Sequence, residues 1–149
     1  MALVRSFFAK TMNQEQKDRL ISEIKGFLLK QKPVLFAYLY GSFLGEGPFR
    51  DVDVAAYVDP APFKTSNEMF NCGLSLAAKV DLAVSGGAVD LRLLNLAPTP
   101  FRFSVISKGK VIFTRDDQKR IDFETRTRSL YFDFLPHLTL HHRYLLLGE

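Results

Sequence analysis

The feature that most constrains the fold is a continuous apolar run from Val34 to Tyr40, with the sequence VLFAYLY. An uninterrupted apolar run of this kind is typical of a strand that is covered on both faces of its sheet. The chain of 149 residues is near the commonest size of a protein domain. We therefore expect one domain over residues 1–149, built around a sheet with helices packed on it.

A helix is expected on the N-terminal side of this strand. Asn13 and Gln16 have the spacing of a capping box, in which each side chain bonds to the backbone of the other residue. The helix must end before Pro33, because the residue that precedes a proline avoids helical angles. The apolar residues between these limits fall on one helical stripe: Leu20, Ile21, Ile24, Phe27 and Leu28.

The rest of the chain shows strand patterns that alternate with helical ones. The expected elements are a strand over 51–58, a helix over 65–84 that Gly86-Gly87 breaks, a strand over 89–96, a short helix over 98–106, a strand over 110–114 and a helix from 117 to about 146, bent at Pro136. This alternation predicts the α/β or α+β class, while the order of the strands stays open.

Three aspartates occur where the expected strands begin. Asp51 and Asp53 are two residues apart, so their side chains project from the same face of a strand. Two such carboxylates repel each other unless a cation lies between them, and magnesium prefers oxygen ligands and keeps phosphates in its shell. Asp90 opens an otherwise apolar strand. If that strand runs beside the strand of Asp51 and Asp53, Asp90 completes an acidic triad.

A glycine-rich loop, GSFLGEGPFR, separates the apolar run from the acidic pair. Glycine lets the backbone approach a phosphate closely, and exposed N–H groups and a hydroxyl can bind phosphate oxygens. Gly41 and Ser42 supply these groups, and Gly45 and Gly47 allow the tight turn that brings Ser42 near the acidic pair. The loop is predicted to form two short turns or one brief helix.

Taken in order, these motifs resemble the polymerase-beta-like nucleotidyltransferase superfamily, and most of all its minimal (MNT) branch of MntA-like antitoxins, the partners of HEPN-domain toxins. The resemblance rests on the loop Gly41-Ser42-Phe43-Leu44-Gly45-Glu46, on Asp51-Val52-Asp53-Val54 and on Val89-Asp90-Leu91. The segment 101–116, FRFSVISKGKVIFTRD, is similar to the short helix, glycine turn and fourth strand of that fold.

The resemblance implies a role for each of these residues. Asp51 and Asp53 would bind two magnesium ions, and Asp90 would ligate the catalytic metal and accept the proton of the attacking hydroxyl. Ser42 and the backbone of Gly41 would hold the β and γ phosphates of ATP. A two-metal site stabilises both the entering and the leaving oxygen of an in-line displacement, here with pyrophosphate as the leaving group.

The loop departs from the pattern of the family in two places. Only eight residues separate Ser42 from Asp51, which is shorter than is usual in the minimal branch. Leu44-Gly45 occupies the place of the usual Ala-Arg, so the loop lacks the arginine of the family. Arg50, which stands where a small polar residue is common, is our candidate for a substitute on the triphosphate.

The resemblance implies an antitoxin that transfers AMP from ATP to a tyrosine hydroxyl of a HEPN toxin. One alternative is a nucleotidyltransferase that acts on a small molecule such as an aminoglycoside, but that class normally carries a second domain for the acceptor. Another is a binding antitoxin that neutralises its partner by contact alone, which would not need three carboxylates. We expect most of the apolar side chains of the last helix to lie in the core and the rest to offer a surface for a protein partner: Tyr131, Phe132, Phe134 and Leu135. A homo-oligomer stays open.

Composition bears on nucleic-acid binding, on membrane insertion and on the cellular location of the protein. The net charge of +4 permits nucleic-acid binding, but without a basic run or an RNA-binding aromatic motif we do not expect it. The longest apolar runs are far shorter than the ~18 residues of a membrane span. The N-terminus is expected to be ordinary mature protein. A single cysteine, Cys72, cannot form an internal disulfide, and we expect a reducing, cytoplasmic location.

Overall fold

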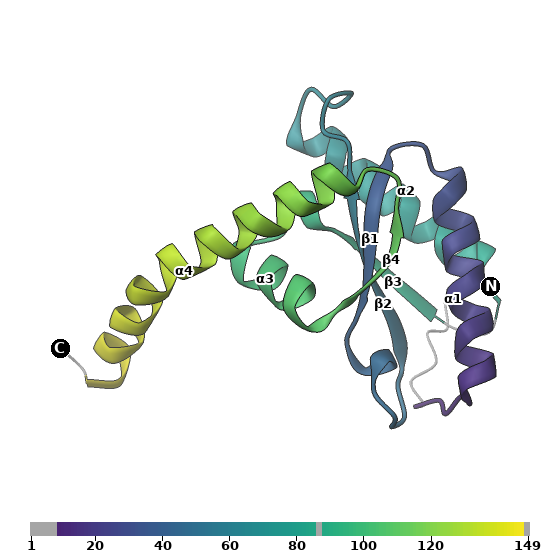
Figure 1. The fold of residues 1–149 in the computed structure, drawn as a ribbon, viewed down its shortest axis with the longest axis horizontal. Helices are drawn as coiled ribbons and strands as arrows, with labels where there is room; N and C mark the ends of the chain where they lie inside the picture. Colours follow the sequence, from purple (N-terminus) through teal and green to yellow (C-terminus); the bar gives the residue numbers. More distant parts are fainter. Residues whose placement is uncertain (1–8, 86–87, 148–149) are drawn as a thin grey trace.

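The computed structural model describes residues 9–85 and 88–147, and the side chains of 9–85 and 88–137. Gly86-Gly87 and the ends of the chain lie outside this part. Figure 1 shows the elements, which are α1 (Gln14–Lys30), β1 (Val34–Tyr40), a 3-10 helix (Ser42–Leu44), β2 (Asp51–Val58), α2 (Ser66–Ala83), β3 (Ala88–Leu93), a second 3-10 helix (Leu94–Leu96), α3 (Thr99–Lys108), β4 (Lys110–Thr114) and α4 (Asp117–Leu147).

The four strands form one mixed sheet in the order β3-β2-β1-β4. β1 lies at the centre and is antiparallel to both β2 and β4, whereas β2 and β3 are parallel. The central place of β1 explains its uninterrupted apolar sequence, because both of its faces are buried from Val34 to Leu39. The α+β class expected from the sequence is confirmed.

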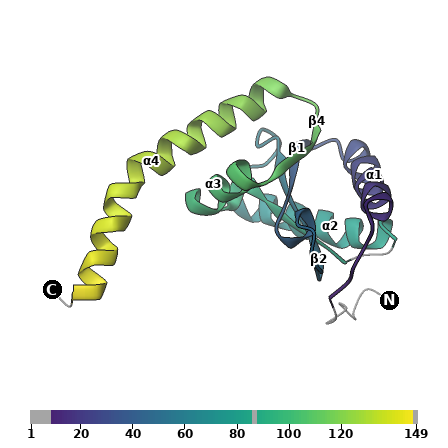
Figure 2. The ribbon, with the colours of Figure 1, turned by 60° about the horizontal axis from the view of Figure 1, so that its bottom comes forward.

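Helices cover both faces of the sheet, as Figures 1 and 2 show. On one face, α1 and α2 pack against the side chains of Val52, Val54 and Leu91, among others, in the larger of two apolar clusters. On the other face, α3 and the start of α4 cover a smaller cluster that includes Phe36 and Tyr38. The odd-numbered residues of β2 therefore face α3 and α4, and the even-numbered residues face α1 and α2.

The predicted start of α1 is confirmed in detail. The side chain of Asn13 accepts a hydrogen bond from the N–H of Gln16 at 2.8 Å, and the N–H of Asn13 donates to the side chain of Gln16 at 3.0 Å. The helix ends at Lys30, ahead of Pro33, also as expected. Of the predicted stripe, Leu20, Ile24, Phe27 and Leu28 are buried in the larger cluster.

The strand predicted over 89–96 is wrong at its end. β3 stops at Leu93, and Leu94–Leu96 form a 3-10 helix instead. The physical reason is Asn95, whose side chain accepts from the N–H of Val58 at 2.9 Å and donates to the carbonyl of Val58 at 2.8 Å. Because these two bonds bind Asn95 to the last residue of β2, the chain turns over the end of the sheet there.

The last helix leaves the body of the molecule. Its first turns pack on β1 and α3, and its C-terminal half extends away from the sheet and changes direction (Figures 1 and 2). Pro136 lies inside α4, where the sequence predicted a bend. The expectation that Phe132 and Phe134 belong to the core is wrong: they are 57% and 48% exposed, because this part of α4 extends away from the sheet. Among the described helices, none has the length and apolar character needed to cross a membrane.

Candidate functional site

The centre of the candidate site is a row of residues across three neighbouring strands. Tyr40 on β1 is the register partner of Asp53 on β2, and Asp53 is in turn the partner of Asp90 on β3. Neighbouring strands lie about 4.8 Å apart, so the three side chains project side by side from one face of the sheet. Asp51, two residues before Asp53, projects from the same face. The adjacency of β2 and β3 on which the acidic triad depends is thus present.

The row is close enough for its charges to interact. The pKa of Asp53 is raised above its ordinary value, first by burial and then by the negative charges of Asp90 and Asp51. The pKa of Tyr40 is raised to about 12, again by burial and then by Asp53. Each of these groups is therefore harder to ionise, first because it is partly buried and then because its neighbours are negative. A cation placed among them would relieve the repulsion.

Arg92 is the cation that the chain itself supplies. It follows Asp90 by two residues on β3, and its Nε lies 3.6 Å from Oδ2 of Asp90. The guanidinium also lies over the ring of Phe101 on α3, 5.9 Å from its centroid. In the described part of the chain, no three Asp, Glu, His or Cys side chains converge as a metal site. The carboxylate of Asp90 is instead paired with Arg92.

The chemistry of this donor set nevertheless fits magnesium. Asp51, Asp53 and Asp90 offer only carboxylate oxygens, which are the ligands that magnesium prefers beside phosphate oxygens and water. All three side chains are partly exposed, so water and a phosphate can reach them. Asp90 and Asp53 are register partners on adjacent strands, so their backbone positions already lie side by side.

The glycine-rich loop begins against Asp53. Gly41 has φ 81°, in the left-handed region that favours glycine. A β-carbon at this position would overlap Oδ2 of Asp53, so the backbone approaches the carboxylate as closely as only glycine allows. Ser42, which is exposed, opens the 3-10 helix that follows. The expected short helix is present, and it places the Ser42 backbone next to the acidic row.

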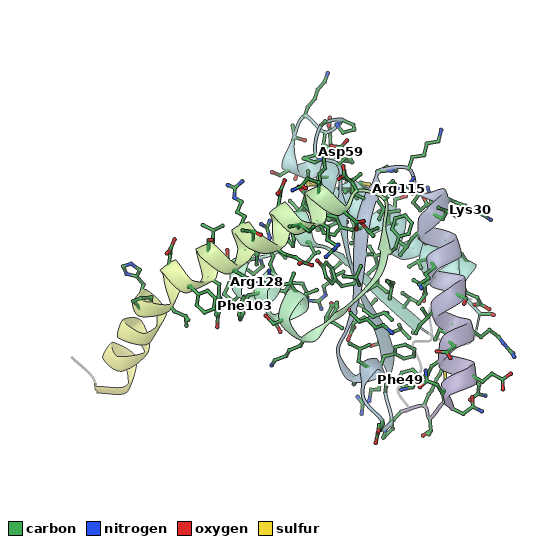
Figure 3. All side chains as sticks on the ribbon, in the orientation of Figure 1. Lys30, Phe49, Asp59, Phe103, Arg115 and Arg128 are labelled. Carbon is green, nitrogen blue, oxygen red and sulfur yellow. The ribbon has the colours of Figure 1, made fainter. Side chains whose placement is uncertain are left out.

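Lys17 on α1 fixes the far side of this loop. Its Nζ donates to the carbonyl of Phe43 at 2.9 Å and to that of Gly45 at 2.8 Å. The same ammonium group lies over the rings of Phe43 and Phe49, 5.1 Å and 5.5 Å from their centroids (Phe49 is labelled in Figure 3). These contacts satisfy the carbonyls of Phe43 and Gly45 from the side of α1. The exposed residues of the loop, Gly41 and Ser42, stay available for a ligand.

Arg50, the candidate substitute for the missing loop arginine, is exposed immediately before β2. Its guanidinium makes no hydrogen bond or ion pair within the described part of the chain. It is therefore available to an external anion, and its role on a triphosphate stays a prediction.

Sequence reasoning missed three residues around the site: Tyr40, Arg92 and Lys17. The signal for Arg92 was present, because a residue two positions after Asp90 on a strand shares its face. Tyr40 was hidden at the end of an apolar run, and its place opposite Asp53 depends on the antiparallel pairing of β1 and β2. Lys17 could not have been found, since its contacts to Phe43 and Gly45 span more than twenty residues of sequence.

Solved structures show the same fold. A tri-AMPylated HEPN toxin of Shewanella oneidensis in complex with its MNT antitoxin includes a chain 22% identical to this one, with a TM-score of 0.53 over 92% of this chain and 98% of the other. A second structure from Shewanella oneidensis is 21% identical, with a TM-score of 0.58 over 91% and 98%. A toxin–antitoxin structure with AMP-PNP is also 21% identical, with a TM-score of 0.52 over 91% and 98%.

At the level of sequence, no curated protein matches the chain significantly. The family model described as "Polymerase beta, Nucleotidyltransferase" matches residues 22–118. The matched range contains the glycine-rich loop, Asp51, Asp53 and Asp90, and it covers more than half of the chain. The chain therefore belongs to the polymerase beta nucleotidyltransferase family.

Proposed function

We propose that this protein is a magnesium-dependent nucleotidyltransferase of the minimal (MNT) branch, which transfers AMP from ATP to a hydroxyl group of a partner protein. It acts in the cytoplasm as the antitoxin of a toxin–antitoxin pair, and its acceptor is a HEPN toxin. The observation that carries the proposal is the close approach of Gly41 to Asp53, together with the register pairing of Asp53 with Asp90, in a chain of the nucleotidyltransferase family.

The loop after β1 binds the triphosphate in this proposal. The exposed backbone of Gly41 and the hydroxyl of Ser42 lie beside the acidic row, where they can donate hydrogen bonds to the β and γ phosphates. Arg50 adds a free positive charge at the start of β2. The Lys17 bonds hold the loop in place, so that little conformational entropy is lost when ATP binds.

Asp51, Asp53 and Asp90 would hold two magnesium ions, which would neutralise phosphate charge and stabilise the entering and leaving oxygens. The acceptor oxygen attacks the α phosphorus, and the bond from this phosphorus to the bridging oxygen breaks. Asp90 accepts the proton of the attacking hydroxyl, and pyrophosphate leaves. Asp90 suits this role because it lies at the outer strand of the row, on the side farthest from the loop that holds the leaving phosphates.

The choice of acceptor is supported by the structural relatives. One of them is the MNT antitoxin in complex with an AMPylated HEPN toxin, and another is a toxin–antitoxin structure with the ATP analogue AMP-PNP. Each covers nearly the whole of its own chain and of this one. The α4 helix exposes Phe132 and Phe134 where it extends away from the sheet, which adds a surface that a protein partner can bury.

The proposal is tested by transfer of label from α-labelled ATP in the presence of magnesium. The full chain is incubated with the HEPN-type protein encoded beside it, and in parallel with an aminoglycoside. We expect label on the protein and none on the aminoglycoside. Label on the aminoglycoside alone would support a small-molecule transferase, and neutralisation of the toxin without any label would support an antitoxin that acts by contact.

A further inference from the structure

The exposed edge of β3 and the groove beside it form a second feature of the site. We propose that this edge docks an extended segment of the acceptor protein, which adds to the sheet as a fifth strand and carries its hydroxyl residue to Asp90. The inference rests on the proposed function for the identity of the acceptor. It adds how the acceptor is bound and which sequence pattern it must have.

The first observation is the open side of the strand. In the described part of the chain, β3 pairs with β2 alone and ends the sheet. The N–H of Val89 turns away from β2 and donates to Asp81 on α2 at 3.2 Å. Because backbone groups alternate sides along a strand, Leu91 and Leu93 direct their N–H groups, and Leu91 its carbonyl, to the same open side. An added strand satisfies these groups by ladder hydrogen bonds.

The second observation is an apolar groove of about 430 Å³ along this edge. β3 forms its floor with Leu91 and Leu93, while α2 forms one wall with Phe70 and Leu74. Both of these wall side chains are 54% exposed, and they are four residues apart on α2, so they lie next to each other and form one apolar surface. The groove therefore offers apolar contacts in line with the unpaired backbone groups, and the two features together fit a strand better than a small ligand.

The third observation is that the groove leads into the acidic row. Arg92 lines it and is also the ion-pair partner of Asp90. The order across the sheet is the phosphate loop after β1, the aspartates of β2, then Asp90 and the open edge. Triphosphate and acceptor thus approach the row from opposite sides, as an in-line displacement requires.

The alternation of side chains fixes the pattern of the docked segment. Asp90 and Arg92 face the side of α3, whereas Leu91 and Leu93 face the side of α2 and the groove. The hydroxyl residue must therefore lie opposite Asp90, with apolar residues directly before and after it in the groove. An acidic residue two positions away meets Arg92, whose side chain is 61% exposed. This pattern is the same in either direction of the added strand.

The test uses the peptide KGEVYVEGK, which has this pattern, and the full-length chain. Binding of the fluorescently labelled peptide is measured by anisotropy. The control peptide is N-methylated at both valines, at the tyrosine and at the second glutamate, which removes the donors that an added strand of either direction points at the carbonyls of Val89 and Leu91, without changing the side chains. On the protein, Leu74→Glu places a charge in the groove, and Leu82→Glu is the matched control on the same helix, because Leu82 is 74% exposed and lies outside the groove.

We expect the parent peptide to bind the wild-type chain and the Leu82→Glu variant equally. Methylation, and separately Leu74→Glu, should each weaken binding at least tenfold, as expected for the loss of about two backbone hydrogen bonds or the burial of a charge. No binding of the parent peptide, or equal binding of the methylated one, overturns the docking proposal. The shift in melting temperature with magnesium and ATP is measured in parallel. Its absence contradicts the proposed function, while the docking result stands by itself.

Discussion

The Cα atom of Gly41 lies against the carboxylate of Asp53, so closely that a β-carbon at position 41 would overlap Oδ2 of Asp53. This contact joins the glycine-rich loop to the acidic row, and the left-handed φ of Gly41 makes it accessible to glycine alone. The loop and the row are therefore one site, although eight residues of sequence separate Ser42 from Asp51.

We predict that Gly41→Ala destabilises the chain by about 1–3 kcal/mol, because the left-handed φ and the overlap with Asp53 both oppose a side chain. It should also weaken ATP binding, since the loop must move away from the row. Urea unfolding and a magnesium–ATP titration measure the two effects. The control is Gly47→Ala, where nothing lies within 4 Å of an added β-carbon. Equal stability of the two variants would contradict the close contact.

Asp53→Asn should stabilise the metal-free chain by about 0.5–2 kcal/mol while it abolishes transfer, because it removes one of three repelling carboxylates. The effect depends on pH. The pKa of Asp53 is raised on folding, so the folded state binds its proton more tightly, and stability falls as pH rises from the ordinary aspartate pKa through the raised one. The Asn variant should lack this decline. Thermal unfolding without metal between pH 3 and 8 measures it, and loss of the fold in the variant would show a structural role for Asp53.

Arg92→Gln should make magnesium binding easier, because the guanidinium of Arg92 competes with magnesium for the carboxylate of Asp90. Asp90 loses its ion-pair partner in this variant, so its carboxylate no longer has to leave Arg92 to bind a metal ion. Magnesium with ATP should therefore stabilise the variant at lower magnesium concentrations than the wild type. The metal-free cost should stay below about 1 kcal/mol, because the ion pair is exposed. Melting temperatures over a magnesium titration at fixed ATP test this. Arg19→Gln, which breaks the exposed Arg19–Glu15 pair on α1, is the control. If Arg92→Gln needed a higher magnesium concentration than the wild type, Arg92 would not compete with magnesium for Asp90.

The base of α4 is held by a buried polar contact that gives a prediction about stability alone. The hydroxyl of Tyr38 donates to Oε1 of Glu124 at 2.6 Å, and Arg120 bonds to the same oxygen at 3.0 Å. Burial, and then Glu124, raise the pKa of Tyr38, so this hydroxyl remains a donor at any working pH. Tyr38→Phe should cost about 1–3 kcal/mol in urea unfolding. Tyr131→Phe, which retains the stack on Phe103, should cost less than about 0.5 kcal/mol.

Much of the fold could be predicted from local patterns. The apolar run of β1, the capping box of α1 and the period-two pattern of β2 each carry their own signal, and the structure has all three. The end of β3 could not be predicted. Leucines continue through Leu94 and Leu96, and the strand stops because Asn95 bonds to Val58, a residue 37 positions away, and Arg102 bonds to the carbonyls of Leu94 and Asn95.

The same distinction holds for the site. Asp51 and Asp53 share a face by local geometry, so their pairing was available from the sequence. The place of Asp90 beside Asp53 depends on the parallel pairing of β2 with β3. The sequence was compatible with this pairing but did not predict it, because the order of the strands stayed open. The carboxylate of Asp90 can pair with Arg92 or share a metal ion with Asp53, and no rule of sequence spacing decides between the two.

The most direct measurement of the central claim is label transfer to the HEPN-type partner by the wild type and by Asp90→Ala, with α-labelled and γ-labelled ATP in parallel. Asp51 and Asp53 remain in this variant, so the melting-temperature shift with magnesium and ATP should survive. The account predicts that the wild type transfers label from the α position and none from the γ position, and that Asp90→Ala transfers neither while it still binds ATP. Equal labelling by the wild type and Asp90→Ala, or transfer from the γ position, would contradict it.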